Sequence, residues 1–166
     1  MILRGSYVAA LLAAFALGCS KASETSTATK ETPVREVVAE LQAALKARDD
    51  AKVWKLLDGD SQADADRVAK TIQGDYVKAS AETKAEQEKA LGLSAAELTS
   101  LTGIGFLKTK RFRGKYDELP DSKIDAVTVQ GDKATVAYTE PDGDKEKLTL
   151  VRQENRWKVS LPMPKP

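Results

Sequence analysis

Histidine is absent from the sequence, and this absence excludes more than any other single feature. Histidine is the common general base near neutral pH and the most frequent metal ligand, so catalytic and metal-centred functions both lose their usual residue. Cysteine occurs once, at Cys19, so no disulfide can form within the chain. We therefore expect no cofactor, no bound metal and no catalytic residue set, and a fold held by its hydrophobic core.

An excess of charge of one sign is also missing. The net charge is +1, and removal of Arg4 with the leading segment would leave 25 basic and 25 acidic residues. Proteins that bind nucleic acid normally carry a basic excess or a basic stripe. The balance therefore predicts no nucleic-acid partner, although it leaves room for a local basic patch.

A long apolar run occurs once, over residues 7–17, after a short positive start. Eleven residues are too few to span a hydrocarbon core of about 30 Å, so the run is typical of a signal segment. The Ala-Leu-Gly-Cys at residues 16–19, where the run ends, resembles the relaxed lipobox of bacterial lipoproteins. This resemblance implies cleavage of residues 1–18, lipidation (including palmitate) of Cys19 and a membrane anchor in the cell envelope, and Ser20 implies outer-membrane sorting. The alternative is an ordinary secretory signal with a chance cysteine.

Residues 20–32 contain no aliphatic side chain larger than alanine, so we expect a flexible tether over residues 19–32. The remaining chain is long enough for one domain, which we place at residues 33–161, with a tail at residues 162–166. Thr32 and Pro33 predict the start of the first helix. Helical periodicity then predicts helices ending before Asp49 and Asp58, a third helix from Ser61 with Val77 as a candidate inward residue, and a bend at Gly74.

Between residues 80 and 116 the sequence indicates where helices begin and end but does not predict how they pack. Residues 80–90 are polar and helix-forming. Gly92 suits a left-handed helix end, and Ser94 with Glu97 predicts a capping box. We expect Gly103 and Gly105 to close the short helix that follows.

From Ser122 the apolar period changes from 3.6 towards 2, which indicates strands. The runs around residues 127–129, 134–138, 148–150 and 157–161 are separated by short turns, so neighbouring strands must be antiparallel. Helices followed by strands predict an α+β fold, with the helices packed on a curved four-stranded meander.

Two segments carry a family resemblance: Val-Gln-Gly-Asp-Lys-Ala-Thr-Val from Val129, and Leu-Thr-Leu-Val-Arg-Gln-Glu-Asn-Arg-Trp-Lys-Val from Leu148. With the early helical hairpin, they resemble the nuclear transport factor two-like superfamily (a cystatin-type half-barrel), in its branch of uncharacterised bacterial lipoproteins. The resemblance covers residues 34–161 and implies a cone-shaped sheet with a pocket. Aromatic residues are candidates for lining that pocket: Trp54, Tyr76, Tyr138 and Trp157.

Three functions follow from this reasoning. The first is a non-enzymatic envelope domain that binds a small ligand or another envelope protein. The second is a structural or assembly accessory whose cone is filled by side chains. The third is an isomerase- or dehydratase-type enzyme, which would require a carboxylate inside the cavity within hydrogen-bond reach of a tyrosine hydroxyl.

The run Lys-Thr-Lys-Arg-Phe-Arg-Gly-Lys over residues 108–115 is basic without an acidic residue. It is a candidate surface for anionic lipids, glycans or an acidic partner, and the alternative is a solvated strand or loop with Phe112 turned inward. Its basic residues are Lys108, Lys110, Arg111, Arg113 and Lys115. The aspartates at 58, 60, 64 and 66 lack the register of a calcium loop, so helix capping is the preferred explanation for them.

Overall fold

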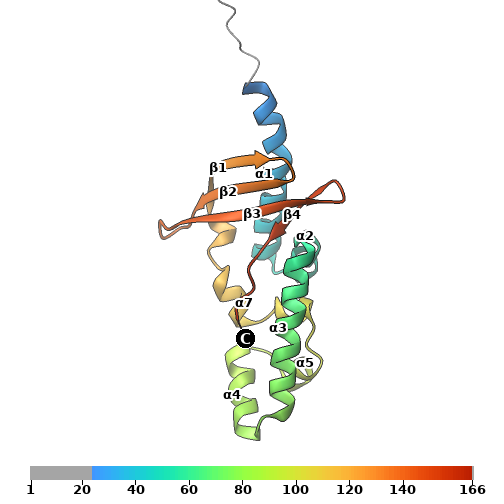
Figure 1. The fold of residues 1–166 in the computed structure, drawn as a ribbon. Helices are drawn as coiled ribbons and strands as arrows, with labels where there is room; N and C mark the ends of the chain where they lie inside the picture. The colour runs from blue at the N-terminus through green and yellow to red at the C-terminus, as the bar shows by residue number, and fades with distance from the viewer. Residues whose placement is uncertain (1–23, 166) are drawn as a thin grey trace, which may run out of the picture.

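The computed structural model describes residues 24–165, so the predictions of a signal segment and a lipidated Cys19 lie outside the described residues. Within that range, helices precede strands, which confirms the predicted α+β class (Figure 1). The helices are α1 (Glu24–Ala47), α2 (Asp50–Leu56), α3 (Gly59–Lys78), α4 (Ala81–Leu91), α5 (Ala95–Thr99), α6 (Gly103–Phe106), α7 (Lys110–Lys115) and the short 3-10 helix η1 (Leu119–Asp121).

The predicted four-stranded meander is confirmed. Strands β1 (Lys123–Gln130), β2 (Lys133–Thr139), β3 (Lys145–Gln153) and β4 (Arg156–Ser160) lie in that order, each antiparallel to its neighbour. The turns use backbone conformations that favour glycine or asparagine, with φ of 60° at Gly131, 98° at Gly143 and 61° at Asn155. A register shift between Ile124 and Ala126 marks a bulge in β1, which is an edge strand.

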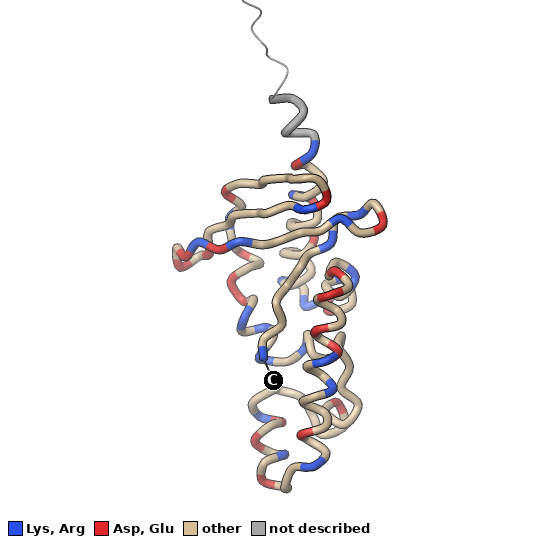
Figure 2. The backbone as a smooth tube through the Cα atoms, in the orientation of Figure 1, with Lys and Arg blue, Asp and Glu red and all other residues tan. Residues whose placement is uncertain are grey.

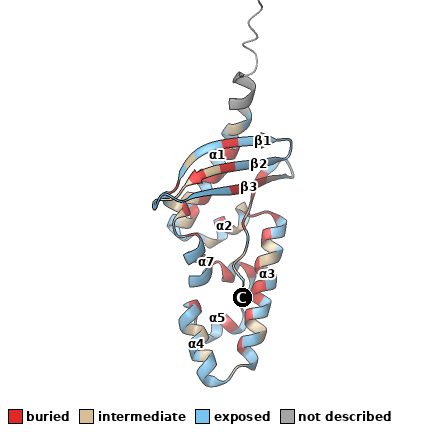
Figure 3. Ribbon diagram, turned by 60° about the vertical axis from the view of Figure 1, so that its left-hand side comes forward, coloured by how far each residue is buried: buried red, intermediate tan, exposed pale blue. Residues whose placement is uncertain are grey.

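One face of the sheet packs on α1 and forms the upper part of the core. In Figure 1 α1 runs behind the sheet, while α3 and α4 extend below it as a helical hairpin. The alternation of the strands directs apolar side chains to α1, and Figure 3 shows buried segments on both. The buried residues of this interface include Val38, Leu41, Val136, Leu150 and Val159.

The predicted start of the first helix is wrong. Helix α1 begins at Glu24, so Pro33 lies inside it and residues 24–32 of the predicted tether are helical. The packed part of α1 already forms the helix nucleus, and each preceding residue then adds at the smaller cost of propagation. Contact with the core nevertheless starts at Val34, next to the predicted boundary of the domain.

Aspartates cap the starts of the next two helices, and α3 begins at Gly59, two residues before the predicted start at Ser61. Asp49 accepts a hydrogen bond from the Lys52 N–H at 2.9 Å at the start of α2. Asp58, which is buried, accepts one from the Ser61 N–H at 2.8 Å at the start of α3. Helix α3 continues without interruption through Gly74, and Val77 is 54% exposed instead of facing inward.

The helix boundaries predicted at Gly92 and Ser94 are confirmed. Gly92 ends α4 with φ of 70°, and Ser94 and Glu97 form both bonds of a capping box. Hydrogen bonds from the Ser94 N–H and the Ser94 hydroxyl to Glu97 Oε2 lower the pKa of the Glu97 carboxyl. The prediction that Gly103 and Gly105 close this helix is wrong, because they lie within α6.

The position of Gly103 requires the absence of a side chain. Its N–H donates to Asp66 Oδ1 at 2.9 Å. A Cβ there would lie 2.4 Å from that oxygen and 2.7 Å from Trp54 Cη2, whereas a Cβ on Gly74 would meet no atom within 4 Å. Glycine was therefore selected by close packing of α6 on α3, a contact that no local pattern reveals.

The substitutions Gly103→Ala and Gly74→Ala should change stability in opposite directions. Gly103→Ala should lower the free energy of unfolding by about 1–3 kcal/mol because the new methyl group overpacks the contact. Gly74→Ala should raise it by about 0.5–1 kcal/mol because alanine loses less backbone entropy in a helix. Urea unfolding followed by far-UV circular dichroism measures both. A tolerated Gly103→Ala would contradict the close α3–α6 packing.

Candidate functional site

A groove of about 800 Å³ lies between α1, α2 and the edge strand β4, and we call it the edge groove. It brings together the two tryptophans of the chain, Trp54 from α2 and Trp157 from β4. The remaining lining residues are Pro33, Glu36, Val37, Glu40, Lys55, Leu56, Gln62, Arg152, Asn155, Arg156 and Lys158. Both indoles were candidates for lining one pocket, but that pocket was expected inside the sheet and not at the edge of β4.

Each tryptophan is positioned by a separate contact. The Trp54 ring lies against α6 next to Gly103, and the Trp54 carbonyl accepts a hydrogen bond from Gln62 Nε2 at 2.8 Å. The Trp157 ring is buried beneath the Arg152 guanidinium, whose central carbon lies 5.7 Å from the ring centroid. This cation–π contact is typical of arginine above indole.

The edge of β4 that faces away from β3 is only partly covered. The Val159 carbonyl accepts the Asp58 N–H at 2.9 Å, and the Leu161 N–H donates to Ser61 Oγ at 2.9 Å. Backbone groups alternate sides along a strand, so the N–H and C=O of Trp157 point to the same open edge. Helix α2 ends at Leu56, and Leu57 forms a bridge with Val159. The backbone groups of Trp157, two residues before Val159, lie beyond that bridge and face the edge groove, which Trp157 lines.

The two walls of the edge groove carry opposite charges. Helix α1 supplies the carboxylates of Glu36 and Glu40, and the strands supply the guanidinium groups of Arg152 and Arg156. The Lys158 ammonium is engaged, because it donates a hydrogen bond to the Lys55 carbonyl. The groove therefore combines apolar surface, charges of both signs and an open strand edge.

A second cavity of about 440 Å³ lies beyond the end of β4 and contains Tyr116 and Tyr138. Burial, with smaller contributions from Glu140 and Glu146, raises the pKa of Tyr138 to about 12. Burial also raises the pKa of Tyr116, whose hydroxyl donates to the Pro162 carbonyl at 2.6 Å. Glu140 and Glu146 line the same cavity, and among the described residues neither tyrosine hydroxyl is hydrogen-bonded to a carboxylate.

Three carboxylates gather beside this cavity. Glu118, Glu140 and Asp142 have ligand atoms within 4.8 Å of one another, and Glu118 Oε2 is buried without a hydrogen-bond partner. Burial, followed by repulsion from the neighbouring acidic groups, raises the pKa of the Glu140 carboxyl. The sequence missed this group, because Glu118 lies far along the chain from the turn that holds the other two residues.

Of the four aspartates between residues 58 and 66, Asp58 has the predicted role of capping its helix. Asp58 caps α3, and Asp64 pairs with Arg67 at 2.6 Å. Asp66 reaches instead to the Gly103 N–H of α6. These roles account for an acidic run that superficially resembles a calcium loop.

The four candidate pocket residues do not line one cavity, which corrects that prediction. Trp54 and Trp157 share the edge groove, while Tyr138 lines the cavity beyond β4. Tyr76 lies in the helical half, where its hydroxyl donates to Glu88 Oε1 at 2.6 Å. That bond is the largest cause of the raised pKa of Tyr76. The prediction failed because the pocket was placed inside the sheet, where α1 packs.

The basic run of residues 108–115 forms α7, not a strand or loop, and Phe112 faces inward as expected. Most of its cations donate hydrogen bonds to other parts of the chain, and the binding of an anionic surface by this run stays a prediction. Lys110 donates to the Lys89 carbonyl, and Arg113 pairs with Asp50 at 3.3 Å. Arg111 and Lys115 donate to the carbonyls of Lys165 and Pro162, and so hold the C-terminal segment. Lys108 lines a separate groove near Arg48 and Glu97.

Comparisons with models of known protein families, with curated proteins and with solved structures found no match. None of the helices formed by the described residues is long and apolar enough to cross a bilayer. The assignment of a function therefore depends on the site geometry.

Proposed function

We propose that this protein is a lipid-anchored envelope domain that binds an extended polypeptide segment in the edge groove. The observation that carries the proposal is the edge of β4 at Trp157, whose N–H and C=O point away from β3 and which lines the edge groove together with Trp54. An extended chain can add to such an edge through main-chain hydrogen bonds, while side-chain pockets supply specificity. The anchor at Cys19 remains a prediction from the sequence.

The chemistry of the groove favours a peptide over a compact small molecule. Apolar surface from Val37, Leu56 and Trp54 can accept alternate side chains of an extended ligand. The opposite charges of Glu36 and Arg156 can select its orientation, because a peptide with one basic and one acidic end would be repelled if reversed.

A second candidate, the structural accessory, is supported by the packed interior. Val38 and Leu41 of α1 occupy the inner face of the sheet opposite Val136 and Leu150, each at most 2% exposed. This arrangement favours a filled cone over an interior ligand cavity. The edge groove lies outside that interior, so a binding function remains compatible with a filled core.

Peptide binding can be tested with tryptophan emission, because both tryptophans line the edge groove. A random heptapeptide display library is selected on the purified protein, and the selected peptides are synthesised and titrated. We expect peptide addition to shift the emission. Glu36→Lys should weaken binding at least about tenfold, equivalent to about 1.4 kcal/mol, because it reverses one charged wall.

The matched control is Glu86→Lys, the same charge reversal at an exposed position on α4, away from the edge groove. It should change the dissociation constant less than about twofold. Failure of the library to yield a peptide, unchanged emission, or equal effects of the two substitutions would contradict the proposal.

A further inference from the structure

The sheet has a second face, directed away from α1, which we call the outer sheet face. Strand alternation and register place on it Lys123 and Lys145 on either side of Thr139, Lys147 opposite Ala137, and Lys133 opposite Val151. These four lysines are exposed, and no hydrogen bond or ion pair involves their ammonium groups within the part of the chain that the structure describes. They differ in this from the cations of α7, most of which bind within the chain.

Acidic residues are nearly absent from the outer sheet face. Asp125, at the bulge of β1, accepts a hydrogen bond from Thr139 Oγ1 at 2.6 Å. Glu146 belongs to the opposite face, since it pairs with Tyr138. The other acidic residues of this half lie between the strands: Asp132, Glu140, Asp142, Asp144 and Glu154. Figure 2 shows acidic positions at the ends of the strands.

The centre of the outer sheet face carries small, hydroxyl-bearing side chains. Thr128 pairs with Thr135, Thr135 with Thr149, and Thr149 with Ser160, so four hydroxyl residues form one row across the strands. Neighbouring strands are about 4.8 Å apart, so the row presents hydroxyls at nearly regular intervals. Hydroxyls can donate to anionic oxygens, and the lysines surround them.

We propose that the outer sheet face binds a linear polyanion, a flexible polymer with phosphate or carboxylate groups at regular spacing. Lys145 and Lys147 are two residues apart on β3, or about 7 Å, and Lys123 lies two strands from Lys145, or about 10 Å. A flexible chain can follow these separations. The contacts would be charge-assisted hydrogen bonds from ammonium and hydroxyl groups to anionic oxygens.

Other occupants fit this face less well. An acidic protein would find no aromatic anchor of the kind that dominates protein interfaces, and Arg156, the arginine of this face, lies on the edge strand β4. An anionic bilayer would find no large exposed apolar group to insert, because Val151 is half-buried. The large hydrophobic residues that are exposed in the described part of the chain, Val77 and Ile104, both belong to the helical half.

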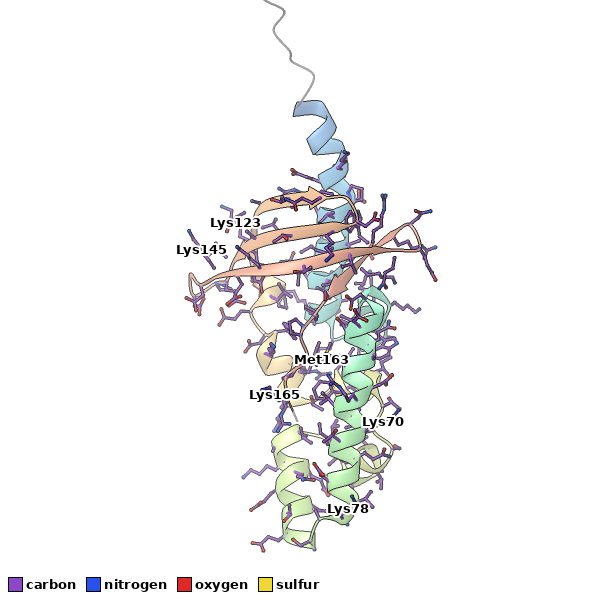
Figure 4. The ribbon with its side chains drawn as sticks, viewed as in Figure 1. Lys70, Lys78, Lys123, Lys145, Met163 and Lys165 are labelled. Carbon is purple, nitrogen blue, oxygen red and sulfur yellow. The ribbon has the colours of Figure 1, made fainter. Side chains whose placement is uncertain are left out.

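The test compares two double substitutions with the same change in charge. Lys123→Gln with Lys145→Gln alters the outer sheet face, and Lys70→Gln with Lys78→Gln alters α3 far from it (Figure 4). The probe is inorganic polyphosphate of defined length, titrated into the full chain at several salt concentrations. Vesicles that contain 30% phosphatidylglycerol serve as the bilayer probe.

We expect the sheet substitutions to weaken polyphosphate binding about tenfold at low salt, and to reduce the slope of log K against log salt by about 1.4, near 0.7 for each lost contact. The α3 substitutions should change binding less than about twofold. Vesicle binding should not respond selectively to the sheet substitutions. Absence of polyphosphate binding, equal effects of the two pairs, or sheet-dependent binding to vesicles alone would overturn the proposal.

Discussion

Replacement of Cys19 with serine should move the protein from the membrane fraction to the soluble fraction, or leave its precursor uncleaved. Cys19 is the single thiol of the chain, so no other side chain can receive a thioether-linked lipid. Each buried methylene of an acyl chain contributes about 0.8 kcal/mol to membrane binding, and two or more chains make the attachment stable. Loss of the lipid should therefore remove membrane association almost completely.

Fractionation followed by intact-mass measurement checks this result, with Ser20→Ala as the control. Ser20→Ala changes the neighbouring residue but keeps the thiol, so the acylated mass should persist. A Cys19→Ser protein with the wild-type distribution and no loss of acyl mass would refute lipidation. The described fold would be unaffected by that outcome, because Cys19 lies outside residues 24–165.

Phe112→Ala should lower the free energy of unfolding by about 3–5 kcal/mol. Phe112 is 1% exposed, and its ring centroid lies 6.2 Å from that of Phe106 and 5.1 Å from that of Tyr116. Removal of the ring leaves a cavity in this aromatic cluster and frees α7, which holds the C-terminal segment through Arg111 and Lys115. A loss of this size is a large fraction of the 5–15 kcal/mol typical of a domain.

Urea denaturation measures the effect, and Phe112→Leu serves as the control because it keeps most of the apolar volume. We expect a loss below about 1.5 kcal/mol for Phe112→Leu. If the alanine protein is too unstable to purify, the leucine protein is compared with Lys110→Gln, a loss of charge at an exposed position of α7. Lys110→Gln should cost less than about 0.5 kcal/mol, which distinguishes packing from charge. A Phe112→Ala protein as stable as the wild type would contradict the described core.

The strands and the helix ends could be predicted because their causes are local. The turns at Gly131 and Gly143 need φ above zero. The side chains of Ser94 and Glu97 each accept a hydrogen bond from the other residue's backbone N–H, within one helical turn. The inward position of Phe112 was predicted from its alternation with basic residues. Each of these features depends on residues only a few positions apart.

What the sequence did not predict depends on contacts between residues far apart in the chain. Gly103 was assigned to a helix end, but close contact with Asp66 and Trp54 decides its role. The basic run of α7 was predicted as a candidate surface patch, and its hydrogen bonds to the carbonyls of Lys89, Pro162 and Lys165 were not predicted. Those partners are 21, 47 and 54 residues away in sequence, beyond the reach of any local pattern.

By itself the sequence determined the α+β class, the strand order of the meander and most helix caps, because period, turn chemistry and capping act over short separations. The tertiary structure decided which cations are engaged, which strand edge stays open and which tryptophans meet. Those properties depend on distances between residues far apart in the chain, such as Trp54 and Trp157, and only packing sets such distances.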